Sequence, residues 1–252
     1  MNIKPVNYSI IMPVYNGRNY FADALMSAIY SSGEQDEIVV IEDGSNDGGV
    51  KSIVENAQDY RVRYFQKDNG GVASALNYGL RVAQNPYFCW LSHDDLFLPN
   101  RLEEDRKLRM FCSDIVTFSS FYLFGANTNY IRLINRKEFA LCRHFATRLL
   151  ARRFMNGCTV TAPISKLKKF GFFDEELRHT QDYDMWLKIL QEQKFSYIEA
   201  PTVMSRQHRN QDSKKMPLAA KREFRKIFIR HRSKISFRAS LALDIMLLLR
   251  SF

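Results

Sequence analysis

A pattern of apolar segment, polar turn and amphipathic segment recurs through the first hundred residues, and no other feature limits the possible folds as strongly. Tyr8–Asn16 is largely apolar, and apolar side chains then recur at helical spacing from Phe21 to Ile29. Ile38–Ile41 is wholly apolar, which is typical of a strand covered by helices on both faces. These segments predict a strand, a helix and a second strand.

Two more predicted strands follow, Val62–Phe65 and Tyr87–Leu91, with a helical pattern from Val72 to Ala83 between them. Repeated β-α alternation predicts the α/β class, with a mostly parallel sheet flanked by helices. Further along the chain we expect a helix over Pro99–Phe111, a strand over Ile115–Phe124, a loop or hairpin over Asn127–Arg136, a helix over Arg143–Phe154, and a turn and strand over Asn156–Ala162.

Polar turns follow each predicted strand. In a parallel sheet these turns share one edge, where ligands bind. Asp43 is suited to accept hydrogen bonds from a base or ribose, and the Gly70-Gly71 backbone is suited to approach phosphate at a helix N-terminus. Each glycine turn taken alone is explained as well by turn geometry. No G-x-G-x-x-G follows the first strand and no G-x-x-x-x-G-K-[ST] occurs, which argues against a dinucleotide site or a P-loop.

Two adjacent carboxylates, Asp94 and Asp95, come after the fourth predicted strand. Mg²⁺ and Mn²⁺ take oxygen ligands, are held by one or two protein carboxylates, and fill their other positions with water and substrate phosphate. The pair therefore predicts a divalent metal site. The alternative is that both residues cap the helix opened by Pro99.

Charge is distributed unevenly along the 252 residues, whose net charge is +10. Residues 214–252 carry eleven Lys or Arg against two acids, whereas residues 1–213 are close to neutral, with 26 against 25. Within residues 214–252, basic residues alternate with apolar ones such as Phe224 and Ile227. This pattern favours either contact with an anionic membrane or a helix packed on the body with a solvated basic face. A nucleic-acid binder is a rival reading, but the neutral body and the lack of a recognisable motif argue against it.

Cysteine usage and hydropathy indicate the compartment. The four cysteines are widely spaced with no C-x-x-C pair, so neither a zinc site nor a disulfide framework is predicted (Cys89, Cys112, Cys142 and Cys158). Cys158 is expected to be a packed residue rather than a nucleophile. Without a signal peptide or an apolar run of membrane-spanning length, we expect a cytoplasmic location.

Four segments, taken together and in order, resemble the motifs of the family 2 glycosyltransferases. They are Ser9–Asn16, Ile41–Asp47, Asn69–Gly79 and Leu91–Asp95, and the resemblance runs over about residues 7 to 210. It implies the GT-A fold, with a nucleotide-binding sheet, for residues 1–213; the charge pattern adds a basic helical extension in residues 214–252.

The resemblance also implies the roles of individual residues at the donor site. It assigns donor binding to Pro13, Val14, Tyr15, Asn16, Asp43, Asn69, Gly70, Gly71, His93 and Asp94. The family's Asp-x-Asp motif departs here at Ser92, where the first Asp usually stands. Asp94 matches the metal-binding Asp, and Asp95 is left as an outer or alternative ligand. Arg206-Gln207-His208 resembles the family's Arg-x-His element, so His208 is expected to close over the diphosphate or complete the metal shell. A polar residue without such a role is the simpler reading of an isolated histidine.

The stretch from Phe170 to Ile189 holds the predicted catalytic base. Tyr183 and Trp186 fall on one face of a predicted helix, and an acid near its start is explained on physical grounds by the helix dipole. The resemblance instead assigns Asp182 as the base, with Gln181 in place of the usual preceding acid, and leaves Asp184 structural.

The function implied by the resemblance is inverting transfer of a sugar from a nucleoside-diphosphate sugar, with UDP as the commoner nucleotide, to a hydroxyl of a glycan or lipid-linked acceptor. A divalent metal, Mn²⁺ or Mg²⁺, is the expected cofactor, and bacterial surface polysaccharide synthesis on the inner face of the membrane is the expected setting. Ser92 and Gln181 leave open a nucleotide-sugar-binding relative without turnover.

Overall fold

The computed structural model describes residues 6–125, 131–135, 155–193, 195–208 and 217–232. Its sheet has the strand order β3-β2-β1-β4-β8-β6-β9-β5, with β7 paired to β6. The strands are β1 (Tyr8–Val14), β2 (Glu37–Asp43), β3 (Val62–Lys67), β4 (Tyr87–Trp90), β5 (Leu96–Phe97), β6 (Thr117–Gly125), β7 (Ile131–Ile134), β8 (Thr161–Pro163) and β9 (Ser196–Gln207).

The four strands β3, β2, β1 and β4 are mutually parallel, as the β-α alternation predicts. Beyond β4 the sheet is mixed. β8 runs antiparallel to β4 and to β6, β9 is parallel to β6, and the short β5 is antiparallel to β9. The prediction of an α/β domain built on a mostly parallel sheet is confirmed for the half that follows the repeated pattern.

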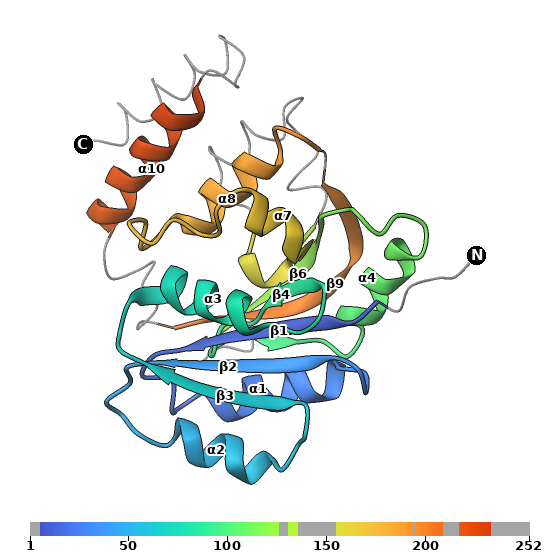
Figure 1. The fold of residues 1–252 in the computed structure, drawn as a ribbon, viewed down its shortest axis with the longest axis vertical. Coiled ribbons are helices and arrows are strands. Elements are labelled where there is room, and N and C mark those ends of the chain that lie inside the picture. Colours follow the sequence, from blue (N-terminus) through green and yellow to red (C-terminus); the bar gives the residue numbers. More distant parts are fainter. Residues whose placement is uncertain (1–5, 126–130, 136–154, 194, 209–216, 233–252) are drawn as a thin grey trace.

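Helices cover both faces of the parallel half, with α1 and α2 on one side and α3 on the other (Figure 1). The described helices are α1 (Phe21–Ser31), α2 (Val50–Ala57), α3 (Gly71–Val82), α4 (Arg101–Arg109), the short η1 (Gly157–Thr159), α7 (Ile164–Lys169), α8 (Gln181–Ile189) and α10 (Pro217–His231). Double coverage explains why β1 and β2 are buried along their whole length and read as continuous apolar runs.

Several boundaries differ from the sequence prediction. α2 and α7 were not predicted. Both are short, with eight and six residues; α2 does carry apolar residues at helical spacing, Val50, Ile53, Val54 and Ala57, whereas α7 buries only Leu167. Arg206, the first residue of the Arg-x-His element, lies within β9 and pairs with Phe124 of β6. The hairpin reading near 127–136 is confirmed by β7, which pairs antiparallel with β6; the helix expected over 143–154 lies outside the described residues.

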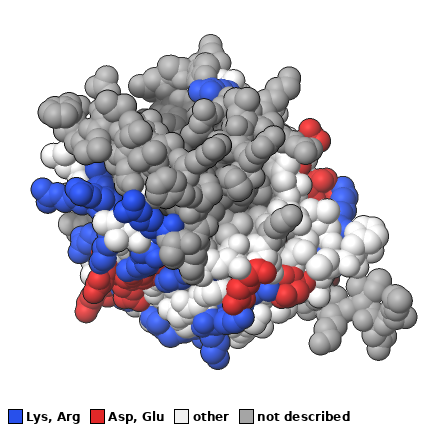
Figure 2. Space-filling model, turned by 90° about the horizontal axis from the view of Figure 1, so that it is seen from above, with Lys and Arg blue, Asp and Glu red and all other residues white. Residues whose placement is uncertain are grey.

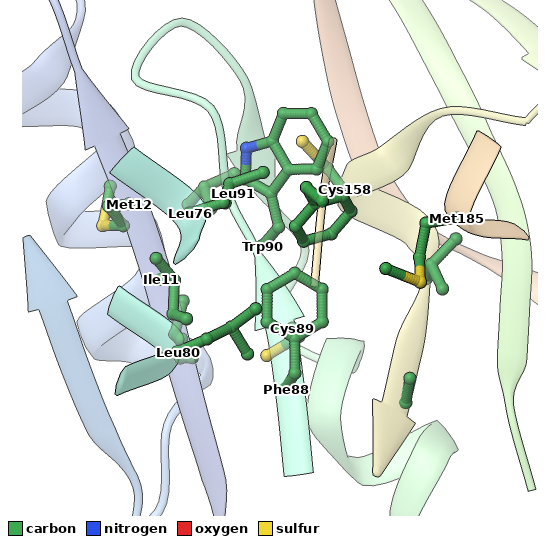
Figure 3. Packing of buried hydrophobic residues seen from close by; sticks show 14 of the residues in the cluster. Ile11, Met12, Leu76, Leu80, Phe88, Cys89, Trp90, Leu91, Cys158 and Met185 are labelled. Carbon is green, nitrogen blue, oxygen red and sulfur yellow. The ribbon is translucent and has the colours of Figure 1, made fainter. Parts of the chain in front are cut away.

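The core runs continuously from the parallel half into the mixed half. Figure 3 shows Ile11 and Leu80 on one side of β4 and Cys158 and Met185 on the other, with Phe88 and Trp90 between them. Trp90 packs so closely on η1 that a Cβ added to Gly157 would lie 2.3 Å from the Cζ3 atom of Trp90. This contact joins the end of β4 to the segment that leads into β8.

Candidate donor and catalytic site

The carboxyl ends of β1 to β4 meet at one edge of the sheet because these strands are parallel. Val14 lies opposite Glu42, and Asp43 lies opposite Lys67. The turns that follow these strands therefore gather as the sequence predicts, and they form the floor of the candidate site.

The turns after β1 and β2 hold each other by hydrogen bonds. The backbone N–H of Asn16 donates to Oγ of Ser45 at 3.1 Å, and the N–H of Asn46 donates to Oδ1 of Asn16 at 2.9 Å. Asn16 has φ of +50°, a conformation that asparagine tolerates better than most residues. The interlocked turns give the site a fixed shape on this side.

The residues at the end of β1 divide into a buried and an exposed pair. Pro13 and Val14 are buried, so their side chains are not accessible to a ligand. Tyr15 is 46% exposed and Asn16 is exposed, which leaves these two side chains accessible to a ligand.

Asp43 is bound by protein groups on both of its oxygens. Oδ1 accepts from Nζ of Lys67 at 2.6 Å and from the N–H of Gly70 at 3.0 Å, and Oδ2 accepts from the N–H of Gly71 at 2.7 Å. The carboxylate thus occupies the N-terminus of α3, where a negative charge is stabilised. The two glycine amides, which the sequence suggested for phosphate, are engaged by Asp43 instead. Asn69 also contacts Asp43, donating from Nδ2 to its backbone oxygen at 2.9 Å.

Asp94 and His208 come together although they lie on different parts of the chain. The Nε2 atom of His208 is 2.9 Å from Oδ2 of Asp94, and the guanidinium Nε of Arg206 donates to the backbone oxygen of Asp94 at 3.0 Å. The His208 ring packs on Tyr20 with ring centroids 5.0 Å apart. The sequence prediction that these two residues share one site is consistent with this geometry.

Asp95 lies behind this pair and is buried. Its Oδ1 accepts from the N–H of Arg206 at 2.9 Å, and its Oδ2 accepts from Nδ2 of Asn156 at 3.3 Å and from Sγ of Cys158 at 3.5 Å. Burial, together with the neighbouring charge of Asp94, raises the pKa of Asp95 to about 7. Asp95 therefore anchors β9 and the 155–158 segment to the end of β4, and protein groups take up both oxygens of the expected alternative metal ligand.

Cys158 is buried, and burial raises the pKa of its thiol well above the usual range. A thiol that stays protonated is a poor nucleophile. The expectation that Cys158 is a packed residue is confirmed.

His93 and Gly17 are in close contact. A Cβ at Gly17 would lie 2.8 Å from Cδ2 of His93, so only glycine allows the ring this position. The imidazole of His93 therefore lies against Gly17, the residue that follows Tyr15 and Asn16 in the turn after β1.

Asp182 lies in the first turn of α8, two residues after Thr180, the N-cap. Its side chain is half-buried, and Oδ1 accepts from the N–H of Tyr183 at 2.8 Å. The hydroxyl of Tyr183 donates to the backbone oxygen of Met155 at 3.2 Å, and the next residue, Asn156, contacts Asp95. Residues 155–156 therefore connect the start of α8 to the acidic pair after β4.

Asp184 is fully buried and structural, as expected. Burial would raise the pKa of Asp184, but contacts from His231, Lys188 and Arg230 outweigh it and hold the pKa well below its usual range. His231 Nε2 lies 2.9 Å and Arg230 Nη1 2.8 Å from Oδ1, so α10 is fastened to α8.

Four contributing residues were missed from the sequence: Tyr20, Lys67, Asn156 and Glu223. Lys67 offered a signal, since a basic residue at the end of β3 is placed beside an acid at the end of β2. The others depend on contacts between distant segments and carry no local pattern.

A divalent cation fits part of this arrangement. Among the described residues no three His, Cys, Asp or Glu side chains converge. Mg²⁺ and Mn²⁺ are often held by one or two protein ligands, with substrate phosphate and water completing the shell. The carboxylate of Asp94 and the imidazole of His208 suit that role, and Nδ1 of His208 is buried without a hydrogen-bond partner in the part of the chain that is described.

Comparison with known proteins finds a matching family model and similar proteins from several bacteria. The model of the family described as glycosyl transferase family 2 matches residues 9–166. An uncharacterized glycosyltransferase of Rickettsia felis is 37% identical over 228 residues, which cover 84% of this chain and 37% of that protein. An uncharacterized glycosyltransferase of Haemophilus influenzae is 30% identical, covering 75% of this chain and 74% of its own length.

A shorter match covers part of the chain. The minor teichoic acid biosynthesis protein GgaB of Bacillus subtilis is 40% identical over 102 residues, which cover 38% of this chain and 11% of that protein. Among solved structures, S. aureus TarS 1–349 in complex with UDP-GlcNAc has a TM-score of 0.71 at 19% identity, covering 88% of this chain and 66% of that one. This likeness shows a shared fold.

Proposed function

This chain belongs to glycosyl transferase family 2, and from that membership we propose that it transfers a sugar from a nucleoside-diphosphate sugar to an acceptor hydroxyl with inversion at the anomeric carbon. The observation that carries the proposal is the pairing of Asp94 with His208 beside the turns that follow β1 and β2. These groups lie at the sheet edge where ligands bind in open α/β folds.

The donor is a UDP-sugar in this proposal. Support comes from TarS, which shares the fold and whose crystal structure holds UDP-GlcNAc. The exposed side chains of Tyr15 and Asn16 would contact the nucleoside, and His93, which lies against Gly17, would form another wall of the same site. Asp43 and Asn69 would shape the pocket by fixing the start of α3, since the Gly70 and Gly71 amides are paired to Asp43.

Asp94 and His208 would hold a divalent metal, with Asp95 supporting the loop behind them. A metal bound there supplies Lewis-acid stabilisation of the negative charge that develops on the leaving diphosphate. Arg206, whose guanidinium also lies 4.6 Å from the centre of the Tyr20 ring, adds a fixed positive charge to this part of the site.

Asp182 would accept the proton of the acceptor hydroxyl as its oxygen attacks the sugar from the face opposite the diphosphate. Its place in the first turn of α8 stabilises the ionised form, because the N–H of Tyr183 donates to the carboxylate and the helix dipole favours negative charge there. Asp184 takes no part, since it is buried and bound by α10.

The acceptor would be a hydroxyl of a growing glycan or a lipid-linked precursor of a bacterial surface polymer. Support comes from the partial match to GgaB, which is named for teichoic acid biosynthesis. Because the chain spans 37% of the Rickettsia felis relative, the activity of the whole protein remains part of this proposal.

The outer face of α10 would contact an anionic membrane while its inner face packs on the body. Phe224, Ile227 and Phe228 of α10 are buried, whereas Leu218 is 69% and Ile229 62% exposed. Arg222 and Arg225 are exposed between these two apolar residues. Figure 2 shows Lys and Arg gathered on the left, the side on which α10 lies in Figure 1. A cationic face with apolar contacts suits an anionic lipid surface.

No described helix has both the length and the apolar content that crossing a membrane requires.

Donor turnover tests the enzymatic proposal. Purified protein is incubated with Mn²⁺ or Mg²⁺, a panel of nucleoside-diphosphate sugars and hydroxyl acceptors, and free nucleoside diphosphate is measured. Acceptor-dependent release from one donor supports the proposal. Thermal stabilisation by a donor without release would instead favour a binding protein without turnover, the alternative suggested by Ser92 and Gln181.

A further inference from the structure

Glu223 of α10 binds the turn that leads into α8. Its Oε1 accepts from the N–H of Arg178 at 3.0 Å, and its Oε2 accepts from the N–H of His179 at 2.8 Å and from the hydroxyl of Thr180 at 3.1 Å. A single carboxylate thus satisfies three consecutive residues that come immediately before Gln181 and Asp182. Glu223 is the one acid within α10, and it is the residue directed at this turn.

The start of α8 also lacks an ordinary side-chain N-cap. Thr180 is the N-cap residue and is fully buried, yet its hydroxyl makes no capping hydrogen bond to α8. That hydroxyl donates to Glu223 instead, while the backbone oxygen of Thr180 accepts from the N–H of Asp184 at 3.0 Å. A cap residue normally stabilises a helix start through its own side chain. Here a carboxylate from another helix binds the N–H groups of the turn that precedes α8 rather than those of α8 itself, and its charge lies at the positive end of the α8 dipole.

The rest of α10 holds Glu223 in register with α8. The ring of Phe224 lies edge-on to Tyr183 with centroids 5.3 Å apart. About two helical turns further, Arg230 and His231 contact the buried carboxylate of Asp184 at 2.8 Å and 2.9 Å. Figure 1 shows the two helices side by side. α10 is thus fixed at two points, the turn before α8 and the middle of α8, with Asp182 between them.

We propose that Glu223 is a positioning residue for Asp182, so that a helix outside the region matched by the family model sets the orientation of the base. This inference rests on the proposed role of Asp182. Glu223 fixes the backbone of residues 178–180, and the direction in which the Asp182 carboxylate leaves the helix follows from that backbone. Misplacing a reacting group by about 1 Å lowers a rate by on the order of 100-fold.

The test compares Glu223→Ala with wild type in steady-state transfer. We expect kcat to fall about 10- to 100-fold, with donor KM and donor-induced thermal stabilisation unchanged, because donor contacts come from the turns after β1, β2 and β4. Glu223→Gln, which keeps one acceptor oxygen and the side-chain volume, should show an intermediate kcat. Thr180→Val should lower kcat and Thr180→Ser should retain it, since only serine keeps the donating hydroxyl.

Two variants of α10 serve as controls for loss of stability. Lys226→Ala removes only an exposed ion pair to Glu176 and should leave kcat at the wild-type value. Arg230→Ala removes the contacts of α10 with Asp184 and Asp174 but none with residues 178–180, so it should lower the melting temperature more than kcat. If Glu223→Ala keeps wild-type kcat, or if Arg230→Ala lowers kcat equally, Glu223 has no specific positioning role.

The outcomes separate this inference from the proposed function. Failure of wild type to release nucleoside diphosphate with any donor would overturn both. Wild-type turnover that survives Asp182→Asn would overturn the base assignment and this inference with it. Turnover that requires Asp182 but tolerates Glu223→Ala would overturn the positioning role alone.

Discussion

The imidazole Nε2 of His208 lies 2.9 Å from Oδ2 of Asp94, although the two residues are 114 positions apart in the chain. The contact depends on β9, which runs antiparallel to β5 so that Met204 pairs with Leu96, just after the acidic pair. Asp95 reinforces it by accepting the N–H of Arg206. Three neighbouring interactions therefore bring the end of β9 to the end of β4, which is what a shared metal and diphosphate site requires.

Replacing either member of this pair should impair catalysis. Asp94→Asn keeps the shape of the side chain but loses the charge that favours a divalent cation, and His208→Ala removes the second ligand. We expect kcat/KM to fall on the order of 100-fold or more for Asp94→Asn and less for His208→Ala. Nucleoside diphosphate release measured across a Mn²⁺ titration checks this. An unchanged metal requirement in both variants would place the metal elsewhere.

Asp182→Asn should abolish transfer while sparing donor binding. The amide retains the volume and an acceptor for the N–H of Tyr183, but it cannot take a proton from a hydroxyl. We expect kcat to fall by about 100- to 10,000-fold, with donor-induced thermal stabilisation unchanged. Asp174→Asn, which alters a partly exposed acid paired with Arg230, is the matched control and should keep full activity. Normal turnover by Asp182→Asn would show that another group acts as the base.

The predictable features of this protein are those recorded locally in the sequence. The apolar runs of β1 and β2 and the turns after them follow from periodicity and parallel pairing, so Asp43 and Asp94 could be placed at one edge in advance. The hydrogen-bond partners of Asp43 could not be predicted. The Gly70 and Gly71 amides looked available for phosphate because a glycine-rich turn does not reveal that an acid from the neighbouring strand already fills the helix N-terminus. The contact between Glu223 and the turn before α8 could not be predicted either, since Glu223 is a single acid within a basic helix.

Gly157→Ala should destabilise the fold near the site. The added Cβ would lie 2.3 Å from the Trp90 ring, a clash with a buried and rigid side chain. Overpacking of this kind costs about 1–3 kcal/mol in unfolding free energy. Gly33→Ala is the control, because its Cβ would lie 3.4 Å from the flexible end of Arg106 and should change stability little. Denaturant unfolding measures both. Adding Trp90→Phe to Gly157→Ala should recover part of the loss; equal stability of Gly157→Ala and wild type would contradict the packing argument.

Asp184→Asn should destabilise the protein at neutral pH and much less in acid. The pKa of Asp184 is lowered in the folded chain, so its charge stabilises the fold above the unfolded pKa of about 3.9, and this contribution is lost as pH falls toward the lower folded pKa. Removing one partner of a buried ion pair costs about 3–5 kcal/mol. Melting temperatures of variant and wild type should therefore differ most above pH 5, begin to approach each other below about pH 4, and meet only as pH falls through the folded pKa. A difference that stays constant with pH would show that the loss is one of packing.

Charge reversal on the outer face of α10 should weaken binding to anionic vesicles. Arg222 and Arg225 are exposed between Leu218 and Ile229, and each basic residue near an anionic surface contributes about 1 kcal/mol. Arg222→Glu with Arg225→Glu should reduce sedimentation with phosphatidylglycerol-containing vesicles by at least about 30-fold in partition coefficient, and vesicles of phosphatidylcholine alone should bind weakly throughout.

The matched control for this experiment reverses two charges on other helices, Lys51→Glu in α2 and Arg81→Glu in α3, so that net charge falls equally. If vesicle binding depended only on net charge, both double variants would lose it equally. Binding that survives in the control but not in the α10 variant locates the contact on this helix. Glu223, on the inner face of α10, holds the turn before Asp182. A membrane-bound α10 would therefore hold the base in place where a lipid-linked acceptor arrives. Equal binding by wild type and the α10 variant, or tighter binding to duplex DNA than to vesicles, would remove the membrane role.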